Sequence, residues 1–163
     1  MTLVSVGSAI LFAYFLAEHN YLLAGLSWVG VIFDALDGYV ARKKGKVTQF
    51  GAFFDSTMDR IADFCYITAF GFAGLISWPF VSLVLLTSFL ISYTKARGES
   101  LLPKDVVIKE GFMQRTERVA LLFIVFLLFL GQQNVLGVIV YIALLVFNTI
   151  TFFQRMRAVK NLL

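Results

Sequence analysis

Five aspartates stand within the apolar stretches of this chain, where carboxylates are rare. They are Asp34, Asp37, Asp55, Asp59 and Asp63. A charged side chain inside a membrane costs roughly 2.5–3.5 kcal/mol on insertion scales, so a cluster of five requires compensation. Carboxylate oxygens are ligands that Mg²⁺ and Mn²⁺ prefer. The chemistry that these residues indicate is therefore the binding of divalent metal ions.

The spacing of the aspartates predicts two acidic helix faces, at about 100° per residue. One face carries Asp34, Asp37, Gly38 and Ala41, and the other carries Gly51, Asp55, Asp59 and Asp63. Only the residues from Lys43 to Thr48 separate the two stretches, so we expect antiparallel neighbouring helices with their acidic ends together. Converging carboxylates repel, and one or two hard divalent cations would neutralise them and bridge them to a pyrophosphate.

Three residues next to the acids have properties that suit a phosphorylated ligand. The planar guanidinium of Arg42 matches a phosphate or a carboxylate. A glycine lowers the stability of a helix by up to about 1 kcal/mol relative to alanine. Close approach of a neighbouring backbone or a flat ligand would explain why Gly38 and Gly51 are present. The alternative for each glycine is ordinary packing of small residues between membrane helices.

The rest of the chain predicts a membrane-embedded helical domain that holds these residues. Of 163 residues, 60% are hydrophobic and 15% are charged, which is too apolar for a small soluble domain. Six stretches are about long enough to cross a hydrocarbon layer of roughly 30 Å as helices, the first being marginal. They are residues 2–17, 21–42, 49–73, 79–96, 113–130 and 135–154. No internal repeat or heptad pattern is evident, so residues 1–163 are predicted to form one irregular all-α bundle.

The distribution of Lys and Arg predicts how the six helices are oriented. These residues gather after the second stretch, around the link between the fourth and fifth, and at the end of the chain. Residues 18–20, 74–78 and 131–134 contain none. Because cations near span ends stay on the cytoplasmic side, both termini and the acidic site are expected to face the cytoplasm. We predict a multi-pass protein of the cell membrane, in contact with membrane lipids and without a nucleic-acid partner.

Three further residues are expected to be structural. Cys65 is the only cysteine, which excludes an internal disulfide and a CxxC metal site. His19 is the only histidine and is expected at the surface, because metal ligands cluster. Asp63, the last acid of its stripe, is expected to pair with Arg60.

The residues from Asp34 to Asp59 follow the pattern DxxDGxxARx8GxxxDxxxD. This pattern defines the CDP-alcohol phosphatidyltransferase family, which the chain therefore resembles. The match covers only residues 34–59, but six spans with cytoplasmic cations fit the remainder. The resemblance implies an enzyme of phospholipid synthesis. Such an enzyme would transfer a lipid-linked phosphoryl group from a CDP-lipid donor to an acceptor hydroxyl and release CMP.

The resemblance also implies roles for individual residues. Asp34, Asp37 and Asp55 would hold two Mg²⁺ or Mn²⁺ ions, and Asp59 would join or face the metal ions and act as the general base. The residues expected to contact the CDP donor are Asp34, Gly38, Ala41, Arg42, Gly51 and Asp55. A homodimer is expected. Family members usually carry an amphipathic segment before the first span, so here that segment is either missing or precedes the first residue given.

The acceptor is predicted from two cationic segments, residues 92–99 and 114–118. They look like the segments of the branch that transfers to inositol phosphate, including archaetidylinositol phosphate and phosphatidylinositol phosphate synthases. The residues expected to bind the acceptor phosphate are Lys95, Arg97, Arg115, Arg118 and Arg157. The alternative for each is that it anchors a helix end. The positive charge favours a phosphorylated polyol, with inositol phosphate first and glycerol phosphate next.

Two other readings of the acidic cluster remain open at this point. Carboxylates within a helical bundle also line the paths of divalent-cation transporters. Against transport, the second and third stretches become apolar away from their acidic ends, so no polar path continues across the membrane. An inactive relative that serves as a scaffold is the other alternative, and its expected signature, loss of a motif aspartate, is not found.

Overall fold

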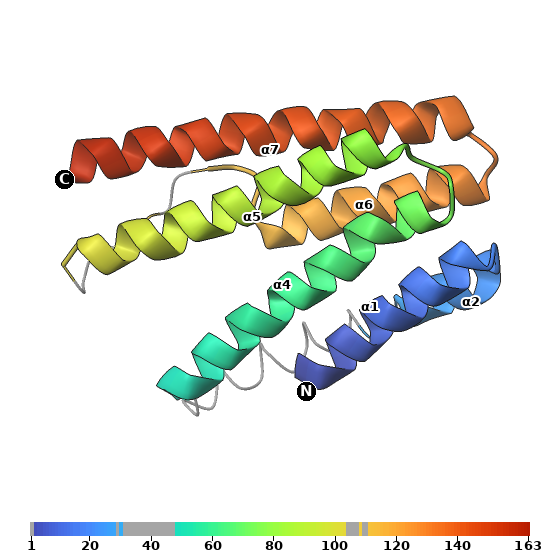
Figure 1. Cartoon of the computed structure of the whole chain (residues 1–163), viewed down its shortest axis with the longest axis horizontal. Helices are drawn as coiled ribbons and strands as arrows, with labels where there is room; N and C mark the ends of the chain where they lie inside the picture. Colours follow the sequence, from blue (N-terminus) through green and yellow to red (C-terminus); the bar gives the residue numbers. More distant parts are fainter. Residues whose placement is uncertain (1, 29, 31–47, 104–107, 109–110) are drawn as a thin grey trace. The chain divides into compact units, whose positions relative to one another are not determined.

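The computed structural model describes residues 2–28, 30, 48–103, 108 and 111–163, and every element in these ranges is a helix. The helices are α1 (Thr2–Ala17), α2 (Tyr21–Ser27), α4 (Gln49–Phe72), α5 (Trp78–Leu101), α6 (Arg115–Leu130) and α7 (Asn134–Leu162) (Figure 1). The all-α prediction is thus confirmed for the described residues. The chain divides into two units, Met1–Ile76 and Ser77–Leu163.

In the first unit, α1 packs against both α2 and α4 around four buried aromatic rings. The ring centroid of Phe12 lies 5.3 Å from that of Trp28, 5.5 Å from Tyr66 and 6.1 Å from Phe70. Trp28 in turn stacks on Tyr66 at 4.7 Å. Aromatic pairs at these separations add to the packing energy of the ring surfaces. This cluster fixes the C-terminal half of α4 against α1.

The ends of α4 follow from local residue types. Thr48 is its N-cap, and the Thr48 hydroxyl oxygen accepts a hydrogen bond of 3.0 Å from the backbone N–H of Gly51. After the C-terminus, Gly74 has a φ of +67°, a left-handed conformation that glycine adopts without steric cost. The helix therefore begins before the acidic stripe and ends at a sharp turn.

In the second unit, α7 packs against both α5 and α6. The buried positions of α7 are Gly137, Tyr141, Leu144, Asn148, Thr151, Arg155 and Ala158, which recur at alternating intervals of four and three residues. Such intervals keep one helix face against its neighbours. Hydropathy did not reveal this seam, because three of its members are polar or charged and one is glycine.

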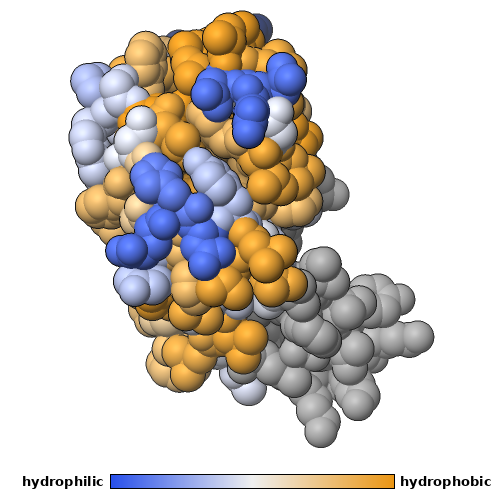
Figure 2. Space-filling model, turned by 90° about the vertical axis from the view of Figure 1, so that its right-hand side faces the viewer, coloured by the Kyte–Doolittle hydropathy of each residue, from blue (hydrophilic) through white to orange (hydrophobic). Residues whose placement is uncertain are grey.

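Two of the helices, α5 and α7, are long and apolar enough to cross a membrane, and Leu3–Ala17 is a shorter apolar helix. Many large apolar side chains of α5 and α7 are exposed, among them Leu86, Ile139 and Phe153. Figure 2 shows a face that is hydrophobic over much of its area, with the hydrophilic residues in separate groups. A surface of this kind is suited to contact with lipid. The count of six spans and the orientation of the termini stay predictions.

Candidate active site

The acidic stripe predicted for residues 51–63 lies on α4, and burial increases along it. Asp55 is exposed, Asp59 is half-buried and Asp63 is buried. Successive members are four residues apart, so their side chains share one face of the helix with Cβ atoms about 5–6 Å apart. The structure therefore brings Asp55 and Asp59 together on one accessible side of α4.

The carboxylates of α4 are chemically suitable ligands for divalent metal ions. Asp55 and Asp59 offer hard carboxylate oxygens one helical turn apart, and paired metal ions in phosphoryl-transfer sites lie about 3.5–4 Å from one another. The partners predicted for them, Asp34 and Asp37, lie outside the described residues, as do Gly38, Ala41 and Arg42. Within the described ranges, no three His, Cys, Asp or Glu side chains converge on one point.

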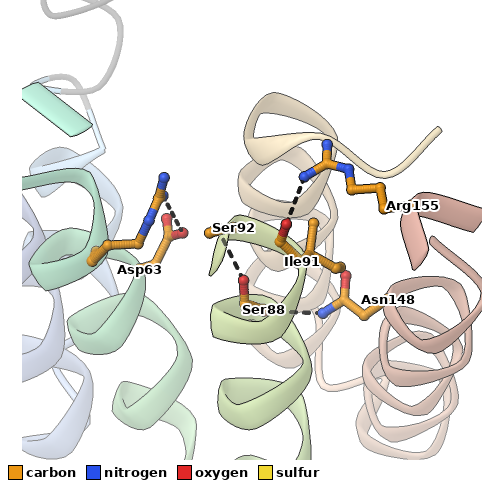
Figure 3. Close-up of polar contacts among 7 residues, drawn as sticks. Asp63, Ser88, Ile91, Ser92, Asn148 and Arg155 are labelled. Atoms are coloured by element: carbon orange, nitrogen blue, oxygen red, sulfur yellow. Dashed lines mark hydrogen bonds and ion pairs between the residues drawn. The ribbon is translucent and has the colours of Figure 1, made fainter. Parts of the chain in front are cut away.

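Asp63 is the most buried acid of the stripe. Its carboxylate Oδ2 forms an ion pair with Nη1 of Arg60 at 3.7 Å, and its side chain is only 3% exposed (Figure 3). A buried carboxylate is stable only when it is paired in this way. The predicted structural pairing of Asp63 with Arg60 is confirmed.

Gly51 has a local structural explanation. A Cβ atom added at Gly51 would lie 2.9 Å from the capping oxygen of Thr48. The absence of a side chain therefore leaves room for the cap that begins α4. Gly51 is also exposed, so it remains accessible to a ligand.

Burial separates the cations that the sequence assigns to the acceptor phosphate. Arg118, in the first turn of α6, is buried at 3% exposure, and Arg115 is half-buried. Lys95 forms an ion pair of 4.0 Å with Glu99 on α5. The exposed Arg97 donates to the hydroxyl oxygen of Ser100 at 3.4 Å. Arg118 is therefore the most enclosed of the predicted ligands.

Arg157 lies on an exposed side of α7. It lines an open groove together with Phe112, Gln154 and Asn161. The residues of α7 in this groove differ from those of the buried seam except for Ala158. The structure therefore places Arg157 at the surface of its unit.

Arg155, two residues earlier, was not among the phosphate ligands predicted from the sequence. It is 6% exposed, and its Nη1 donates to the backbone oxygen of Ile91 on α5 at 2.8 Å (Figure 3). A guanidinium is costly to bury even when it is hydrogen-bonded, so an arginine at this position requires a reason beyond packing. Hydropathy does not mark this burial, because Asn148 and Thr151, which share the buried face of α7 with Arg155, are polar.

Comparisons with known proteins agree on one family. The family model for CDP-alcohol phosphatidyltransferase matches residues 1–150. An archaetidylinositol phosphate synthase of Pyrococcus horikoshii is 34% identical, over 99% of this chain and 82% of that protein. A phosphatidylinositol phosphate synthase of Mycobacteroides abscessus is 31% identical, over 99% of this chain and 76% of that protein.

Solved structures give the same result. The crystal structure of Mycobacterium tuberculosis phosphatidylinositol phosphate synthase with CDP-DAG bound is similar at a TM-score of 0.74 and 29% identity, covering 97% of this chain and 81% of that one. The same enzyme in complex with manganese and citrate gives a TM-score of 0.66 and 32% identity, covering 97% and 78%. The chain belongs to the CDP-alcohol phosphatidyltransferase family.

Proposed function

We propose that this enzyme transfers the lipid-linked phosphoryl group of a CDP-lipid to a hydroxyl of inositol phosphate and releases CMP. The observation that carries this proposal is the similarity, over 99% of the chain, to proteins named archaetidylinositol phosphate synthase and phosphatidylinositol phosphate synthase. Two buried arginines in the second unit agree with an acceptor that carries a phosphate.

In the proposed reaction, the acceptor oxygen attacks the phosphorus that carries the lipid, and the bond from that phosphorus to the oxygen of CMP breaks. CMP leaves with the electron pair, and the hydroxyl proton passes to the carboxylate of Asp59. A general base must come within hydrogen-bond reach of the proton, and the half-buried Asp59 is less solvated than Asp55. Divalent cations, when bound, neutralise the charge of the pyrophosphate.

Further residues of the first unit are assigned to the donor and the metal ions in this proposal. Asp34, Asp37 and Asp55 hold the ions together with Asp59. Gly38, Ala41, Arg42 and Gly51 contact the CDP moiety. The exposure of Asp55 and of Gly51 on the first turns of α4 supports this assignment, because a nucleotide must reach both.

For the acceptor, we propose Arg118 and Arg155 as the principal phosphate ligands. Low exposure supports both, since a guanidinium in a desolvated position binds a phosphate more strongly than one in water. Arg115 and Lys95 are half-buried and are proposed to add positive charge near the acceptor. Arg97 and Arg157 are exposed, and they are proposed as the most solvent-accessible of the acceptor-binding cations.

The proposed setting is a single domain of six membrane-spanning helices with both termini and the active site at the cytoplasmic face. The helix lengths of α5 and α7 support this setting, together with the absence of Lys and Arg from residues 18–20, 74–78 and 131–134. A homodimer and two Mg²⁺ or Mn²⁺ ions per site complete the proposal. The manganese complex of the M. tuberculosis enzyme supports the choice of metal.

The test measures CMP release by the purified protein in lipid, with Mg²⁺, Mn²⁺ or a chelator. Inositol phosphate, glycerol phosphate and serine are offered separately with CDP-diacylglycerol and with an ether-linked CDP-lipid. We expect metal-dependent release with inositol phosphate. Release only with glycerol phosphate would agree with the reaction of the family but would show that inositol phosphate is not the acceptor. Release that persists in chelator would show that the reaction does not require the metal ions.

A further inference from the structure

A row of three buried polar side chains runs along α7. Asn148 and Thr151 have no exposed surface and Arg155 is 6% exposed. Intervals of three and four residues place all three on one helix face. Apolar residues would fill the same positions without any polar group to satisfy, so the row requires a reason beyond packing.

Two members of the row are hydrogen-bonded to α5. The Nδ2 group of Asn148 donates to the hydroxyl oxygen of Ser88 at 3.0 Å, and Arg155 donates to the backbone oxygen of Ile91 at 2.8 Å. Figure 3 shows both side chains of α7 directed toward α5. Ser88 and Ile91 are three residues apart, so the two bonds lie about one turn from each other on the same side of α5. Together they fix the register of α7 along α5.

The middle member is hydrogen-bonded to the segment before α6. The hydroxyl oxygen of Thr151 accepts a bond of 3.2 Å from the backbone N–H of the buried Met113. Two residues earlier, Gly111 has a φ of +99°. A Cβ atom on Gly111 would lie 2.8 Å from Cγ2 of Thr151 and 3.0 Å from Nε of Arg155. The backbone of this segment thus packs directly against the base of the guanidinium.

We propose that Thr151, Asn148 and Gly111 are positioning residues that hold the guanidinium of Arg155 in the orientation that binds the acceptor phosphate. This inference rests on the proposed function. A guanidinium binds a phosphate through paired N–H groups with a fixed direction, so orientation affects affinity. The arginine side chain has many rotamers, and fixing one before binding lowers the entropy lost on binding.

Two substitutions of Thr151 separate its hydroxyl from its methyl group. Thr151→Val removes the acceptor of the Met113 N–H at nearly constant shape, whereas Thr151→Ser keeps that acceptor. Loss of a buried hydrogen bond corresponds to about a five- to tenfold change in an equilibrium constant. We expect Thr151→Val to raise the KM for inositol phosphate by that factor, with kcat and the KM for the CDP-lipid within about twofold of wild type, as for a loss of uniform binding. Thr151→Ser should resemble wild type.

Thr149→Val is the matched control for the valine substitution. Among the described residues, the Thr149 hydroxyl donates within its own helix, to the oxygen of Leu145 at 2.8 Å, and the side chain is half-buried. This variant should leave the acceptor KM unchanged. An equal rise in the acceptor KM of Thr151→Val, Thr151→Ser and Thr149→Val would show that Thr151 has a merely structural role. A fall in the kcat of Thr151→Val without a change in its acceptor KM would show the same.

Gly111→Ala and Gly74→Ala form a second pair, which remains informative if Thr151→Val does not fold. Both glycines have positive φ, but a Cβ on Gly74 meets nothing within 4 Å. Backbone strain is therefore common to both variants, and contact with Arg155 is specific to Gly111. We expect only Gly111→Ala to raise the acceptor KM, and an unchanged KM in this variant would refute the inference.

The same measurements distinguish this inference from the proposed function. If the wild-type enzyme releases CMP with glycerol phosphate but not with inositol phosphate, the proposed acceptor is wrong. The KM comparison is then made with glycerol phosphate, which also carries a phosphate for Arg155. A wild-type enzyme that uses inositol phosphate, with an unchanged acceptor KM in every variant, would refute the positioning role alone.

Discussion

Arg155 and Arg157 provide the sharpest test of the proposed acceptor site, because they differ mainly in their surroundings. Both belong to the last turns of α7, but Arg155 is 6% exposed and bonded to the oxygen of Ile91, while Arg157 is exposed in an open groove. The perturbation is the pair of substitutions Arg155→Gln and Arg157→Gln. Each removes one positive charge and keeps a polar side chain.

The expected magnitudes follow from burial. A hydrogen bond to a charged group contributes about 1.5–3 kcal/mol, and about 1.4 kcal/mol corresponds to tenfold. Arg155→Gln should therefore raise the KM for inositol phosphate roughly 10- to 150-fold. An exposed ion pair contributes about 0–1 kcal/mol, so Arg157→Gln should change the same KM by no more than about fivefold.

The assay follows CMP release while the concentrations of inositol phosphate and of the CDP-lipid are varied separately. Thermal unfolding of each purified variant in detergent controls for loss of the bond to Ile91. Arg155→Lys is the conservative variant, and it should recover part of the affinity because it restores charge without the planar donor pair. The reverse order of effects, with the larger rise in KM for Arg157→Gln, would refute the argument from burial.

Three more predictions concern the acids, the second buried arginine and the aromatic core. Asp59→Asn should abolish turnover while binding of the CDP-lipid persists, because the base is removed and other metal ligands remain; a fully active variant in the CMP assay would contradict this role. Arg118→Ala should mainly raise the acceptor KM, and an unchanged acceptor KM would count against Arg118 as a ligand. Phe12→Ala should lower the free energy of unfolding by about 2–4 kcal/mol, somewhat less than in water because lipid solvates the separated helices. Thermal unfolding in detergent measures this loss, with Phe53→Ala, at a position 66% exposed, as the control that should show no loss.

Hydropathy predicted the positions of most described helices but not all of their ends. α1 has the predicted bounds, and α4 ends one residue earlier than predicted, where Ala73 and Gly74 form a turn. The prediction of one helix over residues 21–42 is wrong, because α2 ends at Ser27 with Trp28 as its C-cap. α5 and α7 continue well past the predicted ends, to Leu101 and Leu162. The apolar signal stops at the first cations, whereas Lys, Arg and Gln are good helix formers and extend the helix into polar surroundings.

For a related reason, the sequence alone predicted the arrangement of the acids on α4 but not that of the arginines on α7. The acids of α4 could be placed on one stripe from their interval of four alone, and the structure has them there. The difference between Arg155 and Arg157 could not be predicted in this way, since it depends on which face of α7 meets α5. That face is marked by Asn148 and Thr151, and polar residues do not contribute to an apolar pattern.

The length of α7 bears on how a buried arginine is tolerated in a lipid bilayer. At about 1.5 Å per residue, the 29 residues of α7 extend about 44 Å, whereas a hydrocarbon layer is roughly 30 Å thick. On the proposed topology, the surplus belongs to the C-terminal turns, so Arg155 lies near the depth of the lipid headgroups. A cation at that depth avoids most of the insertion penalty of the bilayer centre. Arg155 is then enclosed by protein but remains close to water, from which a charged, water-soluble acceptor arrives.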